Sequence, residues 1–143
     1  MEWGRPFRGG LMNGTARQPV AVGIDRSHYS EAALRYEAQM ARRQRRPLRV
    51  VHAFEPGQSS VRPLVGRSTE LTGVFRNSAQ RLCDEALETL AVAYPDLEVS
   101  VRLEPGPVVE TLLDESETAE TMVLGRRGVG GFASLLLGSS TLQ

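Results

Sequence analysis

Apolar residues in this chain gather in four short runs with strand character. The run from Pro19 to Asp25 is almost wholly apolar and ends in a carboxylate, and Leu48 to Phe54 is a second run of this kind. Such runs are typical of strands buried on both faces of a parallel sheet. The alternating segment from Val99 to Leu103 predicts a third strand, and Thr121 to Leu124 predicts a fourth.

Segments with apolar residues at helical spacing separate these strands. The first predicted helix begins after Ser27, a residue suited to cap it, and runs to the arginines at 42–46. The second extends from about Thr69 to Ala93, and the third follows a turn at Gly106 and covers Val108 to Leu113. The chain therefore alternates strand and helix.

Strands that alternate with helices predict an α/β fold with a parallel sheet, right-handed crossovers and helices on both faces. In such sheets, ligands bind outside the carboxyl ends of the strands, where the strand order reverses. Asp25 and Gly125 each follow a predicted strand. If the first and fourth strands are neighbours, these two residues face one crevice.

The amino-acid composition narrows the classes of function that this chain can have. The 143 residues suit a single domain, and 17 basic residues balance 17 acidic ones. This balance favours a small ligand over nucleic acid or a membrane surface, although the arginines at 42–46 could also contact phosphates. The chain contains no lysine, which excludes a Walker-type P-loop, a protein kinase and a pyridoxal enzyme.

Other features of the sequence predict the boundaries of the domain and the cellular compartment. Residues 1–18 have no apolar core, so we interpret them as a disordered tail rather than a signal peptide, and residues 19–143 as the domain. No apolar run approaches the roughly 20 residues that span a bilayer. Cys83, the sole cysteine, lies in a helical pattern and is interpreted as a packing residue. We expect a cytoplasmic protein.

The last twenty residues carry the clearest candidate chemistry. Gly125, Gly128 and Gly138 follow an apolar run with two and nine residues between them, and Ser139, Ser140 and Thr141 come next. Glycines let backbone N–H groups approach an anion, and hydroxyls and a helix N-terminus add donors. The pattern predicts a phosphate-binding loop. The alternative is structural: a strand-end turn at Gly125, a connection at 128–131 and a helix cap at Gly138.

These residues resemble the universal stress protein family, in its ATP-binding type. The resemblance covers about Pro19 to Gln143 and rests on four motifs in order: VAVGIDRS at 20–27, VVHA at 50–53, Gly106-Pro107, and Gly-x2-Gly-x9-Gly-Ser from Gly125 to Ser139. It implies an open, Rossmann-like parallel sheet of the adenine nucleotide alpha hydrolase-like kind. The implied strand order is 3-2-1-4-5.

The resemblance also implies a site for ATP with Mg²⁺. Asp25 would accept hydrogen bonds from the ribose hydroxyls, and the backbone of Ala53 would meet the adenine edge. The glycines and hydroxyls of the motif would hold the phosphates, while Arg126 either contacts phosphate or is a solvated loop residue. The complete implied set is Gly23, Ile24, Asp25, Ala53, Leu124, Gly125, Arg126, Gly128, Gly138, Ser139, Ser140 and Thr141. For Asp25 the alternative is a helix-capping carboxylate, and His52 is interpreted as a packed histidine outside the site.

Family members continue into a fifth strand that commonly forms a dimer edge, whereas this sequence stops at Gln143. We therefore expect a following segment to supply that strand, and a homodimer or a tandem pair of domains.

The sequence leaves three candidate functions. We favour a nucleotide-dependent regulatory or stress-response module with little or no turnover, because the motif brings no evident nucleophile, general base or metal cluster. The rival is an enzyme that cleaves or transfers at the α-phosphate, for which only Arg126 and Arg127 could serve. A flavodoxin-like electron carrier is disfavoured because 25–30 lacks glycine.

Overall fold

The computed structural model describes residues 17–55 and 68–126 of the chain. Within these ranges the elements are β1 (Val20–Gly23), α1 (His28–Gln44), β2 (Leu48–Phe54), α2 (Ser68–Ala93), β3 (Val99–Pro105), α3 (Val108–Thr118) and β4 (Thr121–Val123). Every predicted strand and helix in these ranges is present. The predicted tail, except for its last two residues, and the segment expected to lead to a fifth strand lie outside them.

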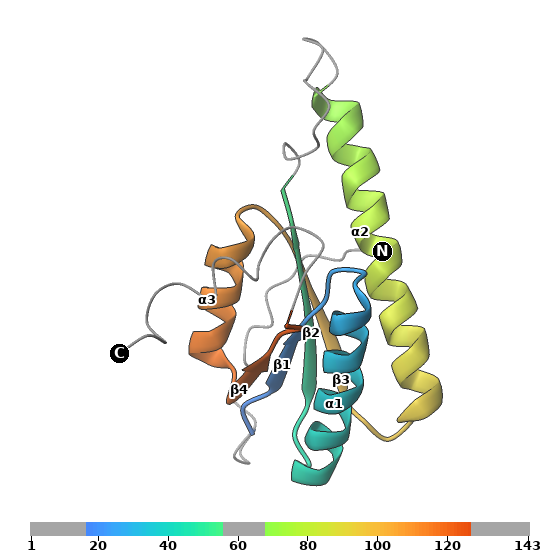
Figure 1. Cartoon of the computed structure of the whole chain (residues 1–143), viewed down its shortest axis with the longest axis vertical. Coiled ribbons are helices and arrows are strands. Elements are labelled where there is room, and N and C mark those ends of the chain that lie inside the picture. The colour runs from blue at the N-terminus through green and yellow to red at the C-terminus, as the bar shows by residue number, and fades with distance from the viewer. Residues whose placement is uncertain (1–16, 56–67, 127–143) are drawn as a thin grey trace, which may run out of the picture.

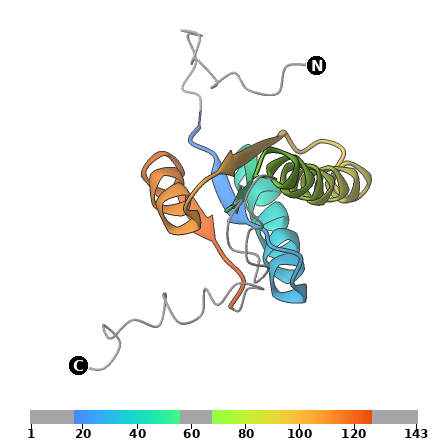
Figure 2. The same ribbon diagram turned by 90° about the horizontal axis from the view of Figure 1, so that it is seen from above.

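The strands form one parallel sheet in the order β3-β2-β1-β4. Helices α1 and α2 cover one face and α3 covers the other (Figures 1 and 2). Strand β2 follows β1 directly through α1, whereas β4 comes from much later in the chain and returns to β1 through α3. The predicted parallel α/β fold is confirmed, and the order reverses between β1 and β4.

The apolar core lies between the sheet and the pair α1 and α2. All four residues of β1 are buried, as the apolar run predicts. Cys83 of α2 is fully buried in the same core, which agrees with its interpretation as a packing residue. The core cluster consists of Val20, Val22, Ile24, Ala33, Leu34, Ala38, Ala41, Leu48, Val50, Cys83, Ala86 and Leu90.

Helix α1 begins and ends by local hydrogen bonding. The hydroxyl of Ser27 accepts a hydrogen bond from the backbone N–H of Ser30 at 3.1 Å, so the predicted cap is confirmed. At the other end Arg45 adopts a left-handed conformation (φ 53°), and its N–H donates back to Ala41 and Arg42. This conformation satisfies carbonyls that would otherwise lack a donor.

Strand β4 is shorter and more exposed than its apolar sequence suggests. It ends at Val123, and Met122 and Val123 are only partly buried. Within the described ranges β1 is the only strand that pairs with it, so β4 forms an edge of this part of the sheet. A strand paired on one side cannot reach the burial of a central strand such as β1.

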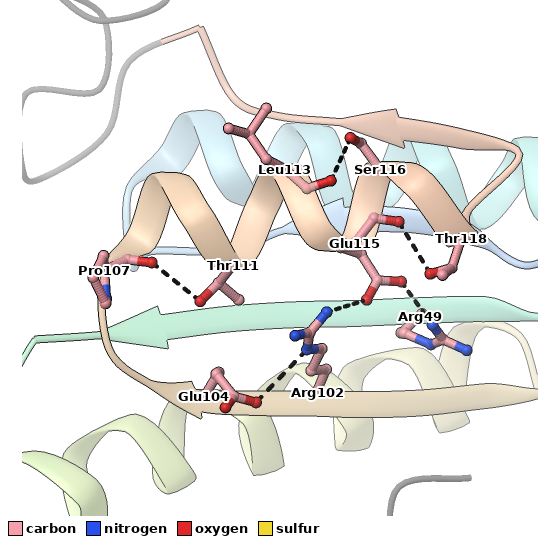
Figure 3. A network of polar contacts seen from close by, with 9 residues as sticks. All are labelled: Arg49, Arg102, Glu104, Pro107, Thr111, Leu113, Glu115, Ser116 and Thr118. Atoms are coloured by element: carbon pink, nitrogen blue, oxygen red, sulfur yellow. Dashed lines mark hydrogen bonds and ion pairs between the residues drawn. The ribbon is translucent and has the colours of Figure 1, made fainter. Parts of the chain in front are cut away.

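The opposite face of the sheet holds a buried carboxylate. Glu115 of α3, with 1% of its side chain exposed, accepts hydrogen bonds from Arg49 of β2 at 2.8 Å and from Arg102 of β3 at 3.1 Å (Figure 3). Glu104 forms a longer, half-exposed ion pair with Arg102 at 3.7 Å. One carboxylate thus joins α3 to two neighbouring strands.

This arrangement predicts that removing the charge of Glu115 lowers the stability of the protein more than removing the charge of Glu104. Glu115→Gln should lower the free energy of unfolding by about 1–3 kcal/mol, because it weakens two charge-assisted hydrogen bonds at a buried site. The matched control Glu104→Gln removes an exposed partner of the same Arg102 and should change stability by about 0.5 kcal/mol or less. Urea denaturation measures both values. Equal losses would show that burial of Glu115 does not set its contribution.

Candidate functional site

The carboxyl ends of β1 and β4 lie side by side. Val22 pairs with Val123 in the parallel register, so the residues that follow each strand, Asp25 and Gly125, leave the same edge of the sheet. On the other side of β1, Gly23 pairs with Val51, which brings the end of β2 to this edge as well. The predicted juxtaposition of Asp25 with the start of the glycine motif is therefore present.

Seven predicted site residues fall in the described ranges and gather at this edge. They are Gly23, Ile24, Asp25, Ala53, Leu124, Gly125 and Arg126. Gly23, Ile24 and Ala53 are buried, whereas Arg126 is exposed. The other five residues, Gly128, Gly138, Ser139, Ser140 and Thr141, lie outside the described ranges, and their part in the site stays a prediction.

The Asp25 carboxylate takes part in the start of α1. Its Oδ1 accepts hydrogen bonds from the backbone N–H of Ser27 at 3.1 Å and from the Ser27 hydroxyl at 2.6 Å. The Ser30 hydroxyl in turn accepts a hydrogen bond from the Asp25 N–H at 3.2 Å. Asp25 therefore supports the start of α1 through the N-cap residue Ser27 and does not itself cap the helix. This support is compatible with a ligand role, because a carboxylate has two oxygens and several acceptor positions.

Arg26 ties the same loop to α2. It has a left-handed backbone conformation (φ 68°), which is uncommon outside glycine, asparagine and aspartate. Its Nη2 donates to the Ser78 carbonyl at 2.7 Å and lies 3.1 Å from the Ser78 hydroxyl. This contact joins residues 52 positions apart in the sequence and holds the β1–α1 loop against a second helix.

His52 holds the loop from the side of β2. Its Nδ1 lies 2.7 Å from the Ile24 carbonyl oxygen, which can only accept, so Nδ1 carries the proton. Burial lowers the pKa of His52, which favours the neutral ring. The histidine is packed and hydrogen-bonded, as interpreted from sequence. Its partner, however, is the carbonyl just before Asp25, so it belongs to the support of the candidate site.

Gly125 permits a close approach between the end of β4 and α1. A Cβ atom at this position would lie 2.7 Å from the Tyr29 carbonyl carbon and 2.9 Å from the Ser30 nitrogen. At Gly23, a Cβ would overlap the side chain of Leu124. Close packing therefore favours glycine at both positions. In the described part of the chain, Gly125 brings the loop against the first turn of α1.

Glu55 is a further acidic residue at this edge that sequence reasoning did not single out. Its Oε1 lies 3.4 Å from the N–H of Val108, the first residue of α3. The preceding Pro107 provides no side-chain cap, so Glu55 supplies an acceptor near the helix start. No sequence pattern reveals a cap that comes from a residue 53 positions away.

Across 17–55 and 68–126, no group of three or more His, Cys, Asp or Glu side chains is arranged to hold a metal ion. In the same ranges, no helix is long and apolar enough to cross a membrane.

The chain matches the Universal stress protein family over residues 16–143. A universal stress protein from Mycolicibacterium smegmatis is 33% identical over 125 residues, which cover 87% of this chain and 40% of that protein. A solved structure described as a universal stress protein in complex with cAMP has a TM-score of 0.58 at 26% identity and covers 87% of each chain. A family member from Burkholderia pseudomallei has a TM-score of 0.61 at 20% identity and covers 78% of this chain and 83% of that one.

The chain therefore belongs to the universal stress protein family. It spans less than half the length of the curated mycobacterial relatives it matches, with 40% of one and 44% of another covered.

The close approach at Gly125 predicts opposite effects of two glycine substitutions. Gly125→Ala should lower the free energy of unfolding by about 1–3 kcal/mol, since the methyl group would press on the backbone of Tyr29 and Ser30. Gly73 lies within α2 with open space around it, so Gly73→Ala should raise stability by roughly 0.5–1 kcal/mol. Thermal and urea unfolding compare the two variants. An unaffected Gly125→Ala protein would contradict the packing role.

Proposed function

We propose that this domain binds an adenine nucleotide, ATP with Mg²⁺, at the edge where β1 and β4 end. The observation that carries the proposal is the juxtaposition of Asp25 and Gly125 at the reversal of strand order, the usual ligand position in open parallel sheets. A similar family structure in complex with cAMP supports an adenine nucleotide as the ligand class.

The residues of this edge fit the chemical parts of such a ligand. The Asp25 carboxylate suits the ribose hydroxyls, which are donors, and the Ala53 backbone suits the adenine edge. Gly125 and Arg126 begin the phosphate loop that continues through Gly128 to the glycine and hydroxyls at 138–141. When bound, ATP supplies the charged phosphates that carry Mg²⁺, an ion that keeps several waters and few protein ligands.

Three described side chains position Asp25 for this role. Ser27 donates to its carboxylate, His52 donates to the carbonyl of the preceding Ile24, and Arg26 attaches the loop to α2. The loop is thereby connected to α1, β2 and α2. A loop held at three points has little freedom left to lose when a ligand binds.

The proposed role of ATP is regulatory, with little or no turnover. Occupancy of the edge would alter the contacts between the β1–α1 loop and α2, because Arg26 joins the two. We further propose a cytoplasmic protein in which this domain pairs with a second one, as a homodimer or as a tandem pair in one longer chain. The length of the curated relatives, more than twice the matched part, supports the tandem arrangement.

The ligand role of Asp25 can be separated from its support of the start of α1. Asp25→Asn keeps an oxygen acceptor for Ser27 but removes the charge, so ATP affinity should fall about 10- to 150-fold, the equivalent of roughly 1.5–3 kcal/mol. The control Ser27→Ala removes the cap and should cost about 1 kcal/mol of stability. Because it keeps the charge but removes a contact that orients the carboxylate, its ATP affinity should fall, but by less than that of Asp25→Asn. Calorimetric titration with Mg·ATP measures both affinities, and a folded Asp25→Asn protein with unchanged affinity would contradict the site.

The regulatory role predicts slow hydrolysis. Steady-state phosphate release should fall well below the enzyme median of about 10 per second, because the described residues of the edge provide a binding carboxylate but no side chain positioned to activate water. A coupled phosphate-release assay on the full-length protein, with Arg126→Ala as comparison, tests this. A fast Mg²⁺-dependent reaction that Arg126→Ala abolishes would favour the enzyme that acts at the α-phosphate.

A further inference from the structure

The end of α1 far from Asp25 carries arginines with no structural partner in the described part of the chain. Arg42, Arg43 and Arg45 are exposed, and none of their guanidinium groups forms an ion pair or hydrogen bond with a described residue. By contrast, Arg46 donates to the Gln18 carbonyl and pairs with Glu120 at 3.4 Å. Arg17 donates to the Gln44 carbonyl.

Capping does not account for the unpaired arginines. Cations at a helix C-terminus commonly bond the last carbonyls. Here the carbonyls of Ala41 and Arg42 accept from the backbone N–H groups at 45 and 46, and the Gln44 carbonyl accepts from Arg17. Three of the last four carbonyls of α1 therefore already have other donors.

A cavity lies beside two of these arginines. It has a volume of about 420 Å³ and is lined by Gln39, Arg42, Arg43 and Tyr94. The first three residues have the i, i+3 and i+4 spacing that places side chains on one face of a helix. Tyr94 comes from the connection between α2 and β3, and it is half-buried against the core. Its backbone is held by bonds to Leu90 and Leu97.

We propose that this cavity binds a phosphorylated small molecule, with the phosphate between Arg42 and Arg43 and an apolar or planar part against Tyr94. Arginine presents a planar fork of donors that matches phosphate oxygens, and Gln39 adds amide donors. The volume lies in the range of about 300–1,000 Å³ that small-molecule sites occupy.

Arg42 and Arg43 attract a phosphate dianion, while other charges near the cavity oppose it. The dipole of α1 places roughly half a negative charge at this end, whereas Arg42 and Arg43 contribute two full positive charges. Asp96 and Glu98 lie on the connection that carries Tyr94, and they form no ion pair within the described ranges. Their negative charges weaken the positive potential that Arg42 and Arg43 create. We therefore expect the phosphorylated ligand to bind weakly, with an affinity that falls as the salt concentration rises.

The site is distinct from the proposed nucleotide edge. Asp25 precedes the first residue of α1, while Arg42 and Arg43 lie in its last turn. A helix of this length separates the two positions by about 20 Å. The two assignments can therefore fail independently.

The experiment is a nuclear magnetic resonance titration of the full chain with inorganic phosphate and with phenyl phosphate at constant ionic strength. We expect saturable shifts of the amide signals of residues 39–43 and Tyr94, and tighter binding of phenyl phosphate because of its ring. The double variant Arg42→Gln/Arg43→Gln should weaken both ligands by about tenfold or more. Asp25→Asn should leave this binding unchanged.

The matched control is Arg35→Gln/Arg45→Gln, which removes the same charge from exposed positions of the same segment that do not line the cavity. Its phosphate affinity should stay within about threefold. Shifts that do not saturate, equal losses in the two double variants, or binding abolished by Asp25→Asn would each overturn the proposal. Phenyl phosphate no tighter than inorganic phosphate would overturn the assignment of Tyr94.

Discussion

The pairing of β1 on both of its edges is the constraint on which the rest of the structure depends. A central strand satisfies its backbone groups with two neighbours, and here one neighbour, β2, is the next strand in the sequence while the other, β4, is the last described strand. The connection to β2 passes over one face of the sheet, and the return to β4 passes over the other. This topology alone brings Asp25 next to Gly125, although 99 residues of sequence lie between them.

The two faces of the sheet are held by different interactions. The face under α1 and α2 is an apolar core, in which the pattern of Val, Leu and Ala residues is regular. Under α3, Glu115 contacts two arginines where an apolar core would place aliphatic side chains. Directional bonds specify how α3 lies across the strands, whereas burial of apolar area is less selective about angle.

Sequence reasoning predicted the elements that follow from local chemistry. The apolar runs predicted the positions of the strands to within a few residues at each end, and Ser27 predicted the start of α1. Contacts between distant residues were not predictable, because nothing in the pattern pairs Arg49 with Glu115, 66 positions away, or Arg26 with Ser78. The spacing of the glycines predicts that Gly125 is small so that a ligand can approach. The structure shows a second cause that the sequence does not reveal, the close contact of Gly125 with the backbone of α1.

The network around Asp25 has a consequence for how the loop would evolve. Ser27 and Ser30 exchange hydrogen bonds with each other and with Asp25, so each of these polar groups depends on the others. A change at one position leaves partners that must find water or a new donor, and its cost therefore depends on which residues occupy the other two. Substitutions at these three positions, which lie within the six residues 25–30, should therefore be tolerated together more readily than singly.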